Sequence, residues 1–102
     1  MIDPALPVSD NAISEFCRRS HIKTLSLFGS IMRDDFQPDS DVDVLVEFEE
    51  DAEISLSDML AMQAELSRLF GNHPVDLVTP VILRNPYRRK SILKDLKQIY
   101  AA

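Results

Sequence analysis

Two aspartates, Asp41 and Asp43, are the residues in this chain best suited to hold a metal ion. They stand two positions apart and are followed by an apolar run at 44–46. Side chains two positions apart on a strand project from the same face. Two carboxylates so close repel each other, and a divalent cation relieves that repulsion. Mg²⁺ suits this pair because it binds one or two carboxylates together with substrate phosphates.

A second motif, upstream of the aspartates, has the residue types of a phosphate-binding turn. Gly29 follows the apolar run 25–28 and permits a close backbone approach with unusual dihedral angles. Ser30 adds a hydroxyl and an N–H at the start of a helical turn, where anions are favoured. Arg33 lies one turn further on and can reach the same phosphates. For this turn to face the aspartates, the two strands that carry them must be antiparallel.

Asp76 is a candidate for a third carboxylate at the same site. It lies near the start of a predicted strand at 75–78. If that strand runs parallel to the strand that follows Asp41, Asp76 joins Asp41 and Asp43 at one end of the sheet. Three carboxylates can hold two metal ions, which stabilise the attacking and leaving oxygens of a phosphoryl displacement. A carboxylate near the acceptor can also help to remove the proton of the acceptor hydroxyl.

The elements that position these residues follow from hydrophobic spacing, caps and turns. The predicted order is helix, strand, turn, strand, helix, strand, helix. The first helix begins after Ser9 or Asp10, and the last begins at Asn85-Pro86. The strands are expected at 25–28, 42–48 and 75–78. The middle helix is expected between a capping box at Ser55 and Asp58 and a C-cap at Gly71. The last helix is expected to carry a buried stripe of Ile92, Leu96 and Ile99.

Composition limits the class of protein. The chain has 102 residues, which predicts one domain spanning 1–102. The net charge of −6 argues against non-specific nucleic-acid binding. Eleven acids and no base lie between 34 and 58, whereas six bases and one acid lie between 84 and 97, so we expect two surfaces with different partners. A single cysteine, no secretory signal and no long apolar run predict a cytoplasmic protein without a membrane segment.

The motifs together resemble those of the minimal nucleotidyltransferases, which belong to the DNA polymerase β-like nucleotidyltransferase superfamily. The resemblance covers nearly the whole chain. The segments that carry it are Leu27-Phe28-Gly29-Ser30-Ile31-Met32-Arg33, Pro38-Asp39-Ser40-Asp41-Val42-Asp43-Val44-Leu45-Val46-Glu47-Phe48 and Val75-Asp76-Leu77-Val78.

The resemblance implies an α/β (α+β) nucleotidyltransferase fold, with a small mixed β-sheet flanked by helices. It implies that Gly29 and Ser30 hold the triphosphate of ATP, and that Asp41, Asp43 and Asp76 bind two Mg²⁺ ions. It also implies an antitoxin that transfers AMP to a tyrosine of a cognate HEPN-type ribonuclease toxin and forms a hetero-oligomer with it. Many family members carry a small residue or glycine after the motif arginine, where this chain has Asp34-Asp35.

Other readings of the same residues stay open. Asp39, Asp41 and Asp43 with Glu50 have the spacing of part of an EF-hand loop, but Val44 stands where that loop needs glycine. Gly29-Ser30 taken alone is typical of an ordinary turn, and Arg33 and Asp76 can be surface residues. The basic run at 88–90 can be a solvated helix face or a contact patch for an acidic partner. The predicted loop residues are His21 and His73, and the predicted core residues are Cys17, Met59 and Met62.

Two other functions compete with protein adenylylation. The chain can neutralise its toxin by binding alone, without catalysis. It can also modify a small molecule such as an aminoglycoside, but those relatives carry a second domain for the acceptor, and 102 residues leave no room for one.

Overall fold

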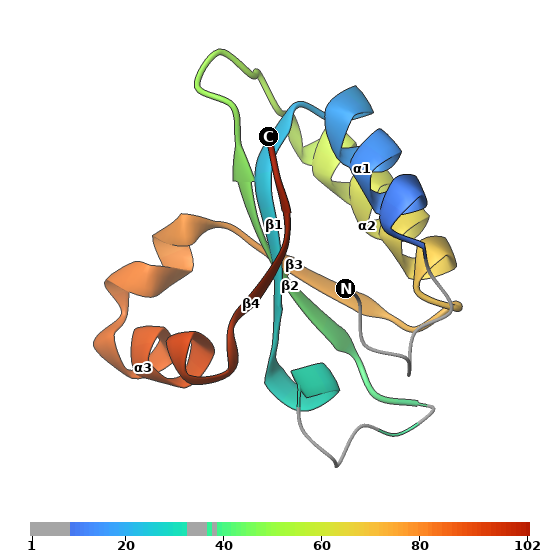
Figure 1. The fold of residues 1–102 in the computed structure, drawn as a ribbon. Coiled ribbons are helices and arrows are strands. Elements are labelled where there is room, and N and C mark those ends of the chain that lie inside the picture. Colours follow the sequence, from blue (N-terminus) through green and yellow to red (C-terminus); the bar gives the residue numbers. More distant parts are fainter. Residues whose placement is uncertain (1–8, 33–36, 38) are drawn as a thin grey trace.

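A four-stranded mixed sheet forms the centre of the computed structural model, which describes residues 9–32, 37 and 39–102 (Figure 1). The strand order is β3-β2-β1-β4. β1 is antiparallel to both β2 and β4, whereas β2 and β3 are parallel. The strands span Ile22–Phe28 (β1), Val42–Phe48 (β2), Val75–Val78 (β3) and Lys97–Ala101 (β4). The predicted mixed sheet and the predicted antiparallel pair of β1 and β2 are therefore confirmed. The parallel pair of β2 and β3, which the sequence left as a condition for Asp76, is supplied by the structure.

Two helices, α1 (Asp10–Arg19) and α2 (Leu56–Leu69), cover one face of the sheet. The side chain of Ser9 caps α1 by accepting a hydrogen bond from the N–H of Ala12 at 3.1 Å. Ser55 and Asp58 form the predicted capping box at the start of α2. The N–H and hydroxyl of Ser55 hold the pKa of the Asp58 carboxyl below its usual value.

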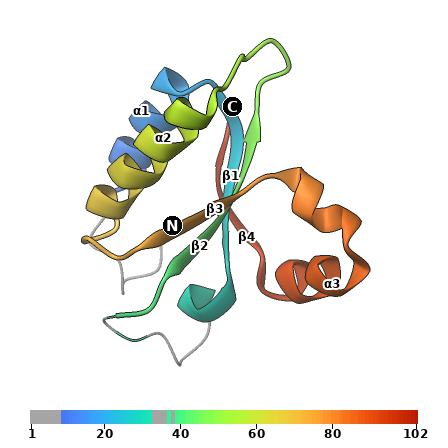
Figure 2. The same cartoon turned by 180° about the vertical axis from the view of Figure 1, so that it is seen from behind.

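The opposite face is covered by the 3₁₀ helix η2 (Pro80–Arg84) and by α3 (Pro86–Asp95), and we call it the α3 face (Figure 2). Asn85 caps α3, because its side-chain oxygen accepts hydrogen bonds from the N–H groups of Tyr87 at 3.0 Å and Arg88 at 3.2 Å. Pro86 takes the first helical position, where its missing N–H costs nothing.

Two apolar cores lie on the two sides of the sheet. The larger core packs α1 and α2 against the sheet, and it contains Phe16, Cys17, Leu66 and Phe70 at 0% exposure. Burial raises the pKa of the Cys17 thiol to about 12, in agreement with the prediction that this residue belongs to the core. The smaller core lies under α3 and consists of Phe28, Leu45 and Ile92, with partly buried neighbours from η2 and β3.

The predicted end of the chain is wrong in one respect. The stripe of Ile92, Leu96 and Ile99 does not lie on one helix, because α3 ends at Asp95 and the chain then forms β4. β4 pairs with the free edge of β1, and this pairing overrides the helical spacing of the apolar residues. β1 is also longer than predicted, since it begins at Ile22. Among the described residues, none of the helices has the length and hydrophobicity that crossing a membrane requires.

Candidate functional site

The Gly29 turn and the carboxylate of Asp43 lie in direct contact. Phe28, the last residue of β1, is the register partner of Asp43 in β2. The chain then turns into a short 3₁₀ helix, η1 (Gly29–Met32), at the end of β1 (Figure 1). Gly29 has a φ of +80°, and a Cβ added to it would collide with Oδ2 of Asp43. The carboxylate therefore occupies the space that any larger residue at this position would need.

Asp76 joins Asp43 from the other side. The parallel register pairs Asp43 of β2 with Asp76 of β3, so their side chains project from the same face of the sheet. This is the α3 face, because Leu45 and Val78, two residues further along each strand, pack under α3. Asp43 is half-buried and Asp76 is exposed. The carboxylates thus lie at the end of the α3 face that the smaller core leaves uncovered.

Asp41 stands one residue before β2 and is exposed. Hydrogen bonds tie the backbone on both of its sides to the segment that leads into β3. The N–H of Val42 donates to the carbonyl of Pro74 at 2.8 Å, and the ring Nδ1 of His73 lies 3.1 Å from the carbonyl oxygen of Ser40. Because a carbonyl only accepts, Nδ1 carries the proton of this hydrogen bond.

His73 is itself held in place. The hydroxyl of Ser67, on α2, donates a hydrogen bond to the carbonyl oxygen of His73 at 2.6 Å. The sequence predicted only that His73 is a loop residue and not a metal ligand. It gave no indication of the bond to Ser40, because the two residues lie 33 positions apart in the chain.

The remaining predicted residues differ in what the structure says of them. Ser30 lies in η1 beside Gly29 and is half-buried. Arg33 lies outside the described residues, as do Asp34 and Asp35. Within the described ranges, no three His, Cys, Asp or Glu side chains are grouped closely enough to hold a metal ion. The structure therefore brings Asp43 to Gly29 and Asp76, while the shared metal site of three carboxylates stays a prediction.

The donor chemistry of this arrangement fits Mg²⁺ bound together with a nucleotide. Asp43 and Asp76 offer carboxylate oxygens from adjacent strands, and Asp41 offers another from the residue before β2. Oxygen ligands are what Mg²⁺ prefers, and it takes part of its shell from water and substrate phosphates rather than from a cage of protein groups. A loose set of carboxylates at an open end of a sheet is compatible with such a metal site.

Comparison with known proteins identifies the family. The model of the nucleotidyltransferase domain family matches residues 9–99, and the chain belongs to that family. Its relatives include a candidate protein adenylyltransferase of Methanocaldococcus jannaschii, 40% identical over 75 residues, which are 74% of each chain.

Solved structures share the fold. A candidate minimal nucleotidyltransferase is 31% identical, covers 86% of each chain and superposes with a TM-score of 0.66. The structure of a toxin–antitoxin with AMP-PNP superposes with a TM-score of 0.68 at 20% identity, and it covers 93% of this chain and 75% of the other. The chain therefore has the minimal nucleotidyltransferase fold that the sequence predicts.

Proposed function

We propose that this protein is an antitoxin that transfers AMP from ATP, with the help of Mg²⁺, to a hydroxyl group of a partner toxin. The observation that carries the proposal is the position of Asp43, which contacts the Gly29 turn and is paired with Asp76. Phosphates held at the turn would lie beside two carboxylates. The comparisons support this proposal, since one relative is a candidate protein adenylyltransferase and one structure with the same fold is a toxin–antitoxin with AMP-PNP.

In the proposed reaction, the acceptor hydroxyl oxygen bonds to the α-phosphorus of ATP. The bond from that phosphorus to the oxygen between the α- and β-phosphates breaks, and pyrophosphate leaves with that oxygen. Mg²⁺, when bound, offsets the charge on the phosphate oxygens and on the leaving pyrophosphate. Gly29 and Ser30 orient the triphosphate, and Arg33 is proposed to assist. Asp41, Asp43 and Asp76 would hold the two cations that we propose. The carboxylate nearest the acceptor takes the hydroxyl proton.

The identity of the partner is also part of the proposal. We propose a HEPN-type toxin whose tyrosine accepts the AMP, as the family resemblance implies, and a stable complex of the two chains. A reducing, cytoplasmic location fits the buried free thiol of Cys17, which forms no disulfide within the chain.

Incubation with Mg²⁺, ATP labelled at the α-phosphate and the protein encoded beside this chain tests the proposal. We expect the neighbouring protein to acquire the label and its ribonuclease activity to fall. The Asp43→Asn variant provides the control, because it removes a charge without changing the size of the side chain. Absence of label with well-folded wild-type protein would contradict the proposal.

A second candidate is an antitoxin that acts by binding alone. It is favoured by the absence, within the described part of the chain, of a cluster of three metal-binding side chains. The variant with Asp41→Asn and Asp43→Asn separates the two candidates in cells that express the toxin. If this variant still neutralises the toxin, the binding candidate stands, and if it folds but fails to neutralise, catalysis is required.

A further inference from the structure

The helix α3 is thinly covered by the rest of the molecule. Of its ten residues only Ile92 is buried, at 2% exposure. Tyr87 is 86% exposed and Leu93 is 43% exposed. An isolated helix of this length is marginal in water, and most helical stability comes from packing against other elements. α3 therefore keeps most of its surface available for a contact outside this chain.

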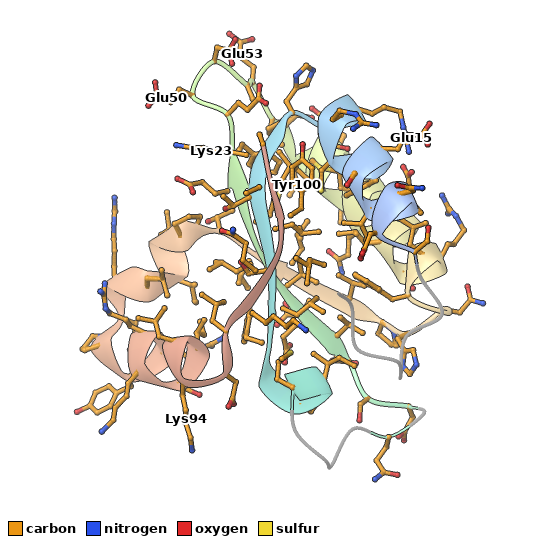
Figure 3. The ribbon with its side chains drawn as sticks, viewed as in Figure 1. Glu15, Lys23, Glu50, Glu53, Lys94 and Tyr100 are labelled. Carbon is orange, nitrogen blue, oxygen red and sulfur yellow. The ribbon has the colours of Figure 1, made fainter. Side chains whose placement is uncertain are left out.

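The basic residues in the first half of α3 are placed unfavourably for the helix. Arg88, Arg89 and Lys90 lie in its first half and its first turn carries no acid, although the amino end of a helix favours negative charge. Lys90 and Lys94 are like charges four positions apart, which repel each other on a helix. None of these four bases forms an ion pair with an acidic group in the described part of the chain. Figure 3 shows Lys94 and the acidic pair Glu50 and Glu53 at opposite ends of the molecule.

A shallow hollow of about 610 Å³ follows one side of the same helix. It is lined by Tyr87, Lys90, Ser91 and Lys94, together with Pro86. The first four are spaced by three and four positions, so they form one stripe along α3. Tyrosine and arginine are among the residue types that most often dominate binding energy at protein interfaces. We call Tyr87 and the four exposed bases of this helix, Arg88, Arg89, Lys90 and Lys94, the basic α3 surface.

The basic α3 surface borders the candidate site. α3 packs on the sheet face from which Asp43 and Asp76 project, and it contacts η1, which contains Gly29. The chain that leaves α3 enters β4, where Lys97 is the register partner of Leu27, two residues before Gly29. A partner that lies along α3 is thus brought to the edge of the nucleotide turn.

We infer that the basic α3 surface is the docking site for an acidic segment of the partner protein that receives AMP. This inference rests on the proposed function. Charge complementarity sets the chemistry of the segment, since the four bases of α3 form no ion pair with an acidic group of the described residues. The chain as a whole has a net charge of −6. A protein fits better than a nucleic acid, because the helix that carries the bases also exposes an aliphatic side chain, Leu93, at 43% exposure. The net negative charge of the chain also opposes binding to a polyanion.

The test reverses three charges of the surface, with the changes Arg88→Glu, Lys90→Glu and Lys94→Glu in one variant. Binding to the protein encoded beside this chain is measured by calorimetry, and transfer of labelled AMP to that protein is measured separately. We expect the Kd for the partner to rise about tenfold or more, because each reversed charge now repels the acidic segment. The affinity of the variant for ATP with Mg²⁺ should stay unchanged, and wild-type binding to the partner should weaken as salt is raised.

A matched control makes the same change of net charge on other surfaces, with Arg18→Glu, Lys23→Glu and Arg68→Glu. All three residues are exposed and lie outside the basic α3 surface. We expect this control to bind the partner within about threefold of the wild type, since distant surface charges are screened.

The outcomes separate docking from catalysis. If the α3 variant binds the partner as tightly as the wild type, or if the wild type does not bind the partner, the docking inference is wrong. If the wild type binds single-stranded poly(U) through α3 while partner binding is unaffected by the variant, the surface serves a nucleic acid and the inference is again wrong. If the partner binds through α3 but acquires no AMP, the docking inference holds and the proposed function fails.

Discussion

The change Gly29→Ala is the sharpest perturbation of the proposed nucleotide turn. Gly29 has a φ of +80°, a conformation that costs an L-residue about 1–2 kcal/mol. The new methyl group would also overlap Oδ2 of Asp43 and would lie 3.1 Å from its Cγ. Overpacking of this kind costs about 1–3 kcal/mol. The loss of flexibility in the unfolded chain returns about 0.5 kcal/mol. We therefore expect a net loss of about 2–4 kcal/mol in the free energy of unfolding.

Gly71→Ala is the matched control for this change. Gly71 has a φ of +74° and is exposed at the end of α2, so the control measures the backbone cost alone, about 1 kcal/mol. Urea denaturation followed by circular dichroism gives both values.

The contribution of the contact itself comes from repeating Gly29→Ala in an Asp43→Ala background. There the nearest remaining atom of residue 43 is Cβ, at 3.4 Å, which is an ordinary contact distance. Gly29→Ala should then cost no more than Gly71→Ala. Equal losses for Gly29→Ala with and without the Asp43 carboxylate would refute the close packing of the turn against this side chain.

Three further predictions concern residues around the site and the core. His73→Asn keeps an N–H near the Nδ1 position and should preserve the affinity for ATP with Mg²⁺. His73→Gln should weaken that affinity about fivefold, the equivalent of one lost hydrogen bond. Calorimetry that finds the same affinity for both variants would contradict a role for His73 in placing Asp41. Ser55→Ala should lower the free energy of unfolding by about 1 kcal/mol near neutral pH. Because the pKa of Asp58 is lowered in the folded protein, the contribution of the capping box is present above the ordinary carboxyl pKa and is lost as the pH falls through the folded pKa. Urea titrations at decreasing pH should therefore show a shrinking difference between wild type and variant, and a constant difference would speak against the cap. Cys17, with a pKa raised to about 12, should resist iodoacetamide at pH 9 in the folded protein and react once urea unfolds it, and rapid labelling of the folded protein would show that the core is open.

Much of the fold could be predicted from the sequence because local patterns and tertiary packing agree there. The apolar residues of 42–48 fill both faces of a central strand, and β2 begins and ends at the predicted residues. The geometry of the site followed from one requirement, that a glycine turn and two aspartates meet, which makes β1 and β2 antiparallel. The sequence did not decide whether β3 runs parallel to β2, and the structure shows that it does.

Other features could not be read from local patterns. Ile99 continues the spacing of a helix, and only the free edge of β1 turns its segment into a strand. The hydrogen bond from His73 to Ser40 joins two loops, and nothing in the types or spacing of these residues encodes it. Arg33 lies outside the described residues, so its predicted contact with phosphates stays a prediction.

The central claim is that Asp43 and Asp76, paired across two parallel strands, hold a divalent cation beside nucleotide phosphates at the Gly29 turn. The most direct measurement is a crystal structure with Mn²⁺ and a non-hydrolysable ATP analogue, in which anomalous scattering locates the metal. We expect a metal peak within coordination distance of both carboxylates, with the triphosphate on the backbone of Gly29 and Ser30. A peak elsewhere, or a triphosphate bound away from this turn, would contradict it.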